Sequence, residues 1–407
     1  MHSEYKSKLK RNVTLPMLVL YGLGNIFGAG IYVLIGEVAG IAGVYIPLSF
    51  LLACVVVSFT ALTYAELSAR YPMSAGEALY INAGFKSPVL STLVGLSIAL
   101  TGLLSSATIL HGFQGYLSTF IEIPEIITTL IVVILISSIA IWGISQSITI
   151  TALLTLIETF GLSMVIYVGF DHVSLDVDTF KSFVPPMNFS LINAIILGAF
   201  LAFYAFIGFE DMVNIAEEVK DPSNTMPKAI IITLIIATIF YIIIAIVSVS
   251  VLPVDELAGS TAPLAKVYET ATHSKATILS SIALFAVING VLIQIIMASR
   301  IFYGMSTHGW LPSFLGVINP RTSTPIYATL IAGLLVFILV TLFPILTLAQ
   351  STSFMIFIIF TLVNISLILI KIKEPNPHGI RTYPMAIPVI AIVLNITLLG
   401  FQIISGF

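Results

Sequence analysis

The chain has 407 residues, of which 58% are hydrophobic and only 9% charged, and its mean hydropathy is +1.11. A soluble globular domain carries roughly 25% charged residues because water must solvate its surface, so this composition excludes a soluble protein and indicates that lipid surrounds most of the chain. The net charge of −3 gives no sign of nucleic-acid binding, and the single cysteine, Cys54, excludes an intramolecular disulfide.

Eleven apolar runs are long enough to cross a lipid bilayer, for which an α-helix needs about 20 mostly apolar residues. Inside lipid every backbone polar group must be paired, so each run is expected to be helical. The sequence therefore predicts an all-α polytopic membrane protein. The spans are placed at about 14–41, 44–67, 88–118, 125–143, 147–170, 190–218, 227–252, 275–304, 324–343, 347–370 and 384–405.

Lysine and arginine gather in alternate segments between these runs, and cytoplasmic loops are the ones that carry an excess of such residues. With the N-terminal tail, residues 1–13, in the cytoplasm, thirteen lysines and arginines lie on the cytoplasmic side. Only Lys181, Lys266 and Lys275 then lie outside. We therefore expect a multi-pass protein of the cell membrane with a cytoplasmic N-terminus and, after eleven spans, an extracellular C-terminus.

Glycine is concentrated in the first span, where residues 21–31 read YGLGNIFGAGI. Each glycine lowers helix propensity by roughly 1 kcal/mol relative to alanine. Gly28, Ala29 and Gly30 therefore predict an interruption of the helix near the middle of the bilayer. The alternative is close helix packing alone, because Gly24 and Gly28 form a GxxxG pair.

The sixth span has a parallel feature, because Glu210 and Asp211 follow Gly208 within an apolar run. A charge in the bilayer costs on the order of 3 kcal/mol on insertion scales and persists where a helix is interrupted or lines a cavity. Spans one and six are five helices apart, so two five-helix units, 14–170 and 190–370, would have opposite orientations, with 384–405 as an additional helix. Interrupted helices at matching positions of two inverted halves indicate the binding site of a transporter.

Two such interruptions offer a site for a zwitterion. A broken helix frees backbone N–H groups at the start of its second half and carbonyls at the end of its first half. The N–H end attracts anions, and the carbonyl end attracts cations. An amino acid presents a carboxylate and an ammonium group a few ångströms apart, so it can be held without any charged side chain.

Four segments, in this order, resemble the amino acid–polyamine–organocation transporter superfamily, and above all prokaryotic permeases similar to cationic amino acid transporters. They are residues 24–32 (GNIFGAGIY), 64–80 (YAELSARYPMSAGEALY), 206–227 (FIGFEDMVNIAEEVKDPSNTMP) and 299–325. The resemblance implies the five-plus-five inverted-repeat fold of sodium-coupled leucine transporters. It also implies amino acid transport by alternating access, as proton-coupled symport or exchange. The family usually has twelve or more spans, whereas eleven are counted here.

The same resemblance assigns the residues that would bind the substrate. It implies that the amides of Gly28, Ala29 and Gly30 hold the carboxylate. The ammonium group would lie near the carbonyls of Ile26, Phe27, Phe206, Ile207 and Phe209, in a set that includes Gly208. The side chain of Tyr204 or Phe206 would form an aromatic lid over the substrate.

Glu158, in the middle of span five, is the candidate for ion coupling, and proton-coupled relatives have a lysine there. It belongs to a stripe of small and polar residues at helical spacing, Ser147, Thr151, Thr155, Glu158 and Gly161, which we expect to face the interior. Glu158 is either a protonated structural residue or a proton carrier that bonds the span-one carbonyls or Asn289; a sodium ion beside it is the rival. Asn289 itself is a site residue or a structural one, and Gln294 is expected to make interhelical hydrogen bonds.

Other acidic residues have open or structural interpretations. Glu37, in the outer half of span one, either lines an entry vestibule or reaches the lipid headgroups. Glu66 and Arg70, one helical turn apart, are expected to form an interfacial pair. Glu217, Glu218 and Lys220 are expected at a solvated helix end, with gating salt bridges as the alternative.

Three rival functions remain to be weighed. The six histidines lack metal-ligand spacing and no GxSxG motif occurs, which argues against an enzyme, and no metal or organic cofactor is implied. One chain with two interrupted helices fits a carrier better than a channel. A polyamine carrier would need acidic side chains in its pocket, and Glu37, Glu158, Glu210 and Asp211 are the candidates. Proton or sodium as coupling ion, the side-chain specificity and the oligomeric state are left open by the sequence.

Overall fold

The computed structural model describes residues 11–32, 34–74, 76–117, 120–174, 183–186, 188–260 and 262–405. These residues are mainly helical, with one isolated parallel bridge between Val13 and Val219, which confirms the all-α prediction. The elements are α1 Leu15–Ile26, α2 Ala29–Tyr32, α3 Leu34–Ala42, η1 Gly43–Tyr45, α4 Ile46–Arg70, α5 Gly76–Phe85, α6 Pro88–Leu117, α7 Glu125–Trp142, α8 Ile144–Gly169, η2 Phe170–His172, α10 Phe189–Tyr204, η3 Glu210–Glu218, α11 Pro222–Val251, α12 Val254–Ala258, α13 Pro263–Thr272, α14 Thr277–Thr307, η4 Ser313–Gly316, α15 Ile326–Leu342, α16 Ile345–Lys373 and α17 Ala386–Ser405.

The predicted spans correspond to these helices. Within the described residues, nine helical segments are long and apolar enough to cross a membrane, and α10 and α15 are shorter apolar helices. The first predicted run contains α1, α2 and α3, with the helix break between α1 and α2, and the sixth contains α10 and η3. Large apolar side chains such as Ile131, Ile134 and Leu334 are exposed on the outer surface, where lipid is the solvent that suits them.

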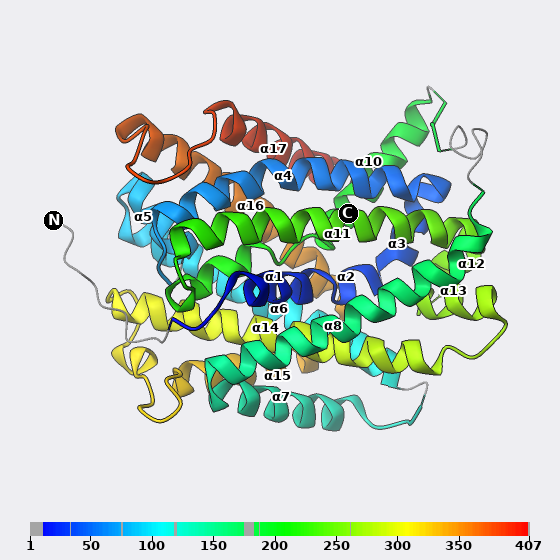
Figure 1. The fold of residues 1–407 in the computed structure, drawn as a ribbon, viewed down its shortest axis with the longest axis horizontal. Helices are drawn as coiled ribbons and strands as arrows, with labels where there is room; N and C mark the ends of the chain where they lie inside the picture. Colours follow the sequence, from blue (N-terminus) through cyan, green and yellow to red (C-terminus); the bar gives the residue numbers. More distant parts are fainter. Residues whose placement is uncertain are drawn as a thin grey trace.

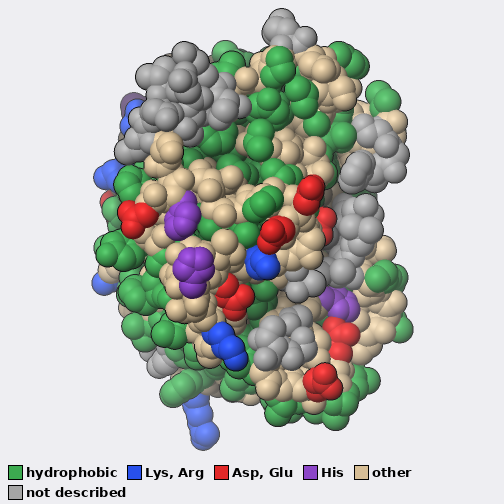
Figure 2. All heavy atoms as spheres, turned by 90° about the vertical axis from the view of Figure 1, so that its right-hand side faces the viewer, with side chains coloured by type: hydrophobic (Ala, Val, Ile, Leu, Met, Phe, Trp, Pro, Cys, Tyr) green, Lys and Arg blue, Asp and Glu red, His purple; other side chains and the backbone are tan. Residues whose placement is uncertain are grey.

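The long helices lie side by side along the longest axis of the molecule (Figure 1). The short helix α5 lies at one end, which we call the α5 end, and α12 and α13 lie at the other, the α12 end (Figure 1). Figure 2 shows acidic and histidine side chains among apolar ones on the α12 end. The α12 end therefore carries polar side chains beyond the apolar outer surface of the long helices, as expected of a membrane protein.

Two pairs of helices make the most extensive contacts, α4 with α11 and α6 with α14. In span order these are the second with the seventh and the third with the eighth, so each pair joins helices five spans apart. Helix α1 packs against α8, α11 and α14, which places it in the interior. The division into units 14–170 and 190–370 stays a prediction, and these pairings agree with it.

Both predicted interruptions are present. Helix α1 ends at Ile26 and α2 begins at Ala29, so the break lies at residues 27 and 28, slightly before the predicted 28–30. In the sixth span, α10 ends at Tyr204 and the chain resumes at Glu210 as a 3₁₀ helix. Gly208 has a φ of 130°, a conformation that only glycine adopts readily, so the second break depends on this glycine.

Candidate functional site

The two helix breaks lie against each other in the centre of the molecule. A Cβ atom added to Gly30 would lie 2.6 Å from the Cα atom of Ala205, so the two backbones touch there. The hydroxyl of Tyr241, on α11, donates to the carbonyl oxygens of Ile26 and Ala205, the latter at 2.9 Å. Its single O–H proton is shared between one carbonyl from each break. Nothing in the sequence marks this residue, because a single tyrosine in an apolar helix gives no distinctive pattern.

A cavity of about 20 Å³ lies between the breaks. It is lined by Asn25, Ile26, Gly30, Ser105, Ile109, Tyr204, Ala205, Ile207 and Gln294. A single water needs about 10–15 Å³ on this scale, so the walls must move apart before an amino acid can enter. Within the described part of the chain, this lining contains no charged side chain.

The residues expected to bind substrate divide into three groups. Ile26, Gly30, Tyr204 and Ile207 line the cavity, and the Tyr204 hydroxyl lies 3.3 Å from the hydroxyl of Ser105 on α6. The three phenylalanines at the breaks, Phe27, Phe206 and Phe209, are fully buried in aromatic contacts instead. Gly28 and Gly208 lie in the breaks but outside the lining, and Ala29 opens α2 with its side chain outside the described set.

The ring of Phe206 shows why its predicted role as a lid is less suited to this conformation. Its centroid lies 5.0 Å from that of Tyr241 and 6.5 Å from that of Phe50. These contacts hold the ring between α4 and α11, away from the cavity lining. Tyr204, the other candidate for the lid, does line the cavity.

A hydrogen-bonded network connects the cavity to Asp211. The Asn25 amide nitrogen donates to Gly208 O at 2.9 Å and to Asp211 Oδ2 at 2.5 Å. The Gln294 amide nitrogen donates to Asn25 Oδ1 at 3.0 Å and to Asp211 Oδ2 at 2.7 Å. The interhelical bonding predicted for Gln294 is therefore confirmed. Asn25 was not singled out from the sequence, although it stands within the glycine-rich segment.

The adjacent acids of the sixth span are buried beside the break, as their placement in an apolar run suggested. Glu210 and Asp211 are 1% and 3% exposed. Glu210 Oε2 accepts the backbone N–H of Gly208 at 2.8 Å. The break thus supplies donors for carboxyl groups that an intact helix in lipid would leave without partners.

Glu158 is fully buried where α8 meets α1 and α14. Its Oε1 accepts the Asn289 amide at 2.9 Å, and its Oε2 has no hydrogen-bond partner among the residues that the structure describes. The same Asn289 amide lies 3.1 Å from the Thr155 hydroxyl, which also bonds Leu20 O at 3.0 Å. The polar stripe therefore faces inward as predicted, except that the side chain of Ser147 lies outside the described set. The contact with Asn289 is the one expected for either role of Glu158.

The α5 end is closed by contacts that connect η3 to its neighbours. Glu218 Oε1 and Arg300 Nε, from α14, form an ion pair at 2.8 Å with both side chains buried. Glu217 Oε1 accepts the backbone N–H of Ser74 at 3.0 Å. The prediction of a solvated helix end at Glu217 and Glu218 is wrong, because their side chains are 3% and 0% exposed. Tertiary packing of α14 and the α4–α5 connection covers them.

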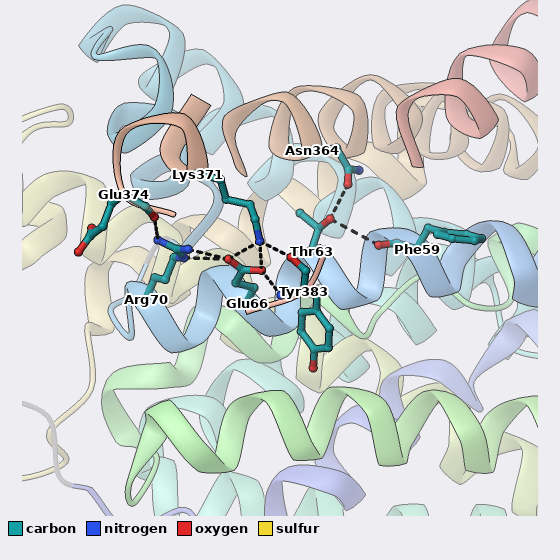
Figure 3. Close-up of polar contacts among 8 residues, drawn as sticks. All are labelled: Phe59, Thr63, Glu66, Arg70, Asn364, Lys371, Glu374 and Tyr383. Atoms are coloured by element: carbon teal, nitrogen blue, oxygen red, sulfur yellow. Dashed lines mark hydrogen bonds and ion pairs between the residues drawn. The ribbon is translucent and has the colours of Figure 1, made fainter. Parts of the chain in front are cut away.

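A second buried ion cluster lies at the same end (Figure 3). Glu66, on α4, accepts from Arg70 at 2.7 Å and from Lys371 of α16 at 2.7 Å. Its other contact is the backbone N–H of Tyr383 at 2.8 Å. The predicted pair of Glu66 and Arg70 is confirmed, and it is buried because α16 and the segment after it fold over the end of α4.

The remaining candidates have simpler outcomes. The side chain of Glu37, on α3, is exposed, which agrees with either a vestibule or a headgroup contact. Across the residues that the structure describes, no group of three or more histidine, cysteine or acidic side chains is placed to hold a metal ion.

Comparison with known proteins places this geometry in a family. The family model described as amino acid permease matches residues 15–406. The chain is 26% identical over 393 residues to the branched-chain amino acid permease BcaP of Bacillus subtilis (strain 168), covering 91% of this chain and 83% of the relative. It is 26% identical to the mitochondrial cationic amino acid transporter 3 of Arabidopsis thaliana, covering 91% of this chain but only 64% of that longer protein. It is also 26% identical to a methylthioribose transporter of Bacillus subtilis (strain 168), with coverages of 96% and 88%.

A solved structure supports the fold. The substrate-bound, outward-open state of a Na⁺-coupled sialic acid symporter superposes with a TM-score of 0.65 at 14% identity, covering 96% of this chain and 90% of that chain. This likeness identifies the leucine-transporter-like fold, with first and sixth helices interrupted. Because the family match extends over nearly the whole sequence, the chain belongs to the amino acid permease family and is a secondary amino acid transporter rather than an enzyme.

Proposed function

We propose that the cavity between the two helix breaks is the binding site for the zwitterionic part of an amino acid. The observation that carries this proposal is the direct contact of the breaks around a cavity whose lining has no charged side chain in the described part of the chain. The amides at Gly28, Ala29 and Gly30 begin a helix and would hold the carboxylate. Carbonyls of the first helix halves, Ile26 among them, would hold the ammonium group.

The aromatic lid in this proposal is Tyr204. Its ring lines the cavity and its hydroxyl is close to Ser105 of α6, so a small rotation would cover or uncover a ligand. Tyr241 is the second tyrosine of the site. Its hydroxyl donates a hydrogen bond to the carbonyl oxygen of Ile26. The substrate ammonium would donate to the same carbonyl, so the bond from Tyr241 would weaken when substrate binds.

The neutral lining favours an amino acid over a polyamine. A polyamine has no carboxylate and carries two or more positive charges, which need acidic partners when water is excluded. The nearest acidic group, Asp211, already accepts hydrogen bonds from Asn25 and Gln294. A polyamine would have to break this network, whereas a zwitterion uses backbone groups that the breaks provide.

Alternating access would proceed by opening one end of the molecule at a time. We place the α5 end in the cytoplasm of a cell-membrane protein, because thirteen of the lysines and arginines fall on that side in the expected topology. The N-terminus is then cytoplasmic and the C-terminus extracellular. The Glu218–Arg300 pair would close the cytoplasmic route and would have to separate for release into the cell.

Glu158 is the proposed coupling residue, with a proton as the coupling ion. Its Oε2 lies buried without a hydrogen-bond partner among the described residues, while Asn289 binds its Oε1. Burial without a cation favours the neutral, protonated carboxyl. Loss of the proton would leave a charge against α1 and α14 and would bias the helices toward a different arrangement.

The decisive experiment is a ligand panel scored by thermal stabilisation of the purified protein. A ligand that binds the native state at 100 times its Kd stabilises it by about 2.7 kcal/mol. We expect stabilisation by at least one amino acid, and none by its decarboxylated amine, by its deaminated acid or by polyamines. Methylthioribose belongs in the panel because a relative is named for it. Stabilisation by amines alone would refute the zwitterion site.

A matched pair of variants shows whether such a ligand occupies the cavity. Ile109 lines the cavity on α6, whereas Leu96 lies on the same helix with an exposed side chain. Ile109→Phe should remove ligand stabilisation because the larger ring fills a space of about 20 Å³. Leu96→Phe should leave it unchanged. Equal stabilisation in both variants would place the ligand elsewhere.

A further inference from the structure

Glu77 is a buried acid that the transport site does not use. It lies on α5, a short helix between the membrane-spanning helices α4 and α6. Its side chain is 1% exposed, and both carboxyl oxygens lack a hydrogen-bond partner within the described residues. Buried polar groups are almost always paired, so two unpartnered oxygens on one carboxyl group call for an explanation.

The atoms around Glu77 form a polar cluster where α4, α5 and η3 meet. The Tyr64 and Tyr80 hydroxyls, the Ser74 hydroxyl and the Asn214 amide nitrogen are all buried and likewise lack partners in the described structure. The rings of Tyr64 and Tyr80 are 6.3 Å apart, and Asn214 Oδ1 accepts the backbone N–H of Gly76 at 3.2 Å. Asn214 and Tyr64 are near enough to influence the Glu77 carboxyl.

The charged groups that face this cluster are acidic. Asp211 and Glu210, both on η3, interact with Glu77 by like-charge repulsion. The buried cations at this end are engaged elsewhere: Arg300 with Glu218, and Arg70 and Lys371 with Glu66. An ionised Glu77 would therefore be a buried charge beside two further acids. Such a group binds a proton rather than remain charged.

The position of Glu77 links this proton to the closure of the α5 end. The α4–α5 connection is attached to η3 through Ser74 N to Glu217 Oε1 and Gly76 N to Asn214 Oδ1. If η3 separates from α5, both contacts break and water reaches the Glu77 carboxyl. In water the carboxyl is ionised at neutral pH.

We propose that Glu77 is a proton-binding site of the closed α5 end, which takes up one proton from water as η3 closes on α5 and releases it when they separate. The site is distinct from Glu158, which lies on α8 against Asn289. The proposal rests on the alternating access described above, since it needs the α5 end to open. No bond other than the carboxyl O–H forms or breaks.

The sign of the pH dependence follows from burial. Burial raises the pKa of Glu77 from 4.5 to about 8; its own backbone N–H opposes this shift, the negative charge of Asp211 adds to it, and Asn214 and Tyr64 oppose it. A group with a raised pKa in the closed state stabilises that state fully below its open-state pKa and loses the effect as pH rises through the closed-state pKa. Opening should therefore increase between about pH 5 and 8, by at most tenfold per pH unit, and level off above.

The experiment measures how fast a thiol placed in the closed end is labelled. In a Cys54→Ser background, Ser74→Cys introduces a thiol at a site that is 0% exposed, so that a charged maleimide reacts when the end opens. The protein is held in lipid nanodiscs, which leave both faces accessible. Asn376→Cys, in an exposed segment, reports the reactivity of a free thiol at each pH.

The comparison is between Ser74→Cys alone and Ser74→Cys with Glu77→Gln. After division by the Asn376→Cys rate, labelling with Glu77 present should rise by up to tenfold per pH unit from about pH 5 to 8. With Glu77→Gln the corrected labelling rate should rise less steeply with pH, by up to the same tenfold factor per pH unit, because the titrating group is absent. Glu77→Asp should restore the steeper rise. Equal slopes with glutamate and glutamine would overturn the proposal.

Two arrangements keep the outcome clear. If Glu77→Gln does not fold, Glu77→Ala also removes the titrating group and supplies the same comparison. The labelling needs no substrate, so a missing slope refutes the proton site whether or not amino acids bind. Conversely, a failure of amino acids to stabilise the protein would leave the Glu77 slope in place.

Discussion

The contact between Gly30 and Ala205 allows a sharp test of the site. In Gly30→Ala the new methyl carbon would lie 2.6 Å from Ala205 Cα and 3.0 Å from Ala205 Cβ. Because the first of these atoms is backbone, no side-chain rotation relieves the clash, and the two helix breaks must separate. Overpacking of this kind costs about 1–3 kcal/mol.

The cost should appear as lost substrate affinity. The amide end of one break and the carbonyl ends of both must stay in register to hold the carboxylate and the ammonium group together, so a methyl group that displaces α2 from Ala205 should weaken binding. A change of 1–3 kcal/mol corresponds to about 5- to 150-fold in affinity. The helix propensity that alanine gains over glycine, roughly 1 kcal/mol, stabilises the open and closed conformations equally and therefore cancels in the binding constant.

Gly400→Ala, on α17 and outside the cavity lining, is the matched control, since the added carbon would have no atom within 4 Å. The substitution is the same, but it meets no neighbour and lies outside the proposed site. We expect a change within about 0.5 kcal/mol. The assay is equilibrium binding of a radiolabelled amino acid to purified protein, with thermal unfolding as the check of folding. Unchanged affinity in Gly30→Ala, or an equal loss in Gly400→Ala, would show that the contact with Ala205 does not support the binding site.

Three other substitutions test the coupling residue, the closure of the α5 end and the bonds at the breaks. Glu158→Gln keeps an oxygen that can accept from Asn289 but cannot release a proton, so uptake driven by a proton gradient should stop while exchange continues in proteoliposomes. Intact gradient-driven uptake would show that Glu158 is structural. Uptake that depends on a sodium gradient instead would favour sodium as the coupling ion. Arg300→Met leaves Glu218 buried without its cation, which costs about 3–5 kcal/mol. Thermal stability should fall in this variant and should largely recover when Glu218→Gln is added. A double variant as unstable as Arg300→Met would argue against the Glu218–Arg300 ion pair. Tyr241→Phe removes the hydroxyl that bonds the carbonyls of Ile26 and Ala205 and should cost about 1–3 kcal/mol in thermal unfolding; a stability equal to the parent would show that these carbonyls find other donors.

Much of the architecture was readable from local patterns. Eleven apolar runs predicted helices that the structure contains, because in lipid the backbone has no alternative to internal pairing. The glycine-rich segment and the pair Glu210–Asp211 located both breaks to within a few residues, since each violates the rule for an intact helix in lipid. The inward face of the Glu158 stripe followed from helical spacing in the same way.

The errors came from residues whose surroundings lie far away in the sequence. Glu218 appeared to belong to a solvated helix end, yet it pairs with Arg300, 82 residues later. Glu66 and Arg70 formed a pair as expected, but Lys371 and the segment after α16 bury it. A polar sequence near a helix end indicates either water or a polar partner, and local sequence does not distinguish them.

The amino acid sequence by itself determined that the chain spans a membrane, where its helices begin and end, and that two of them are interrupted. These properties depend on transfer from water to lipid and on backbone pairing, which act over a few turns of helix. Tertiary structure alone decided which polar atoms meet: Tyr241 with the freed carbonyls, Asn25 and Gln294 with Asp211, and Glu77 with no partner in the described structure. Such contacts require side chains from distant helices to converge within about 3 Å, and no local pattern encodes that distance.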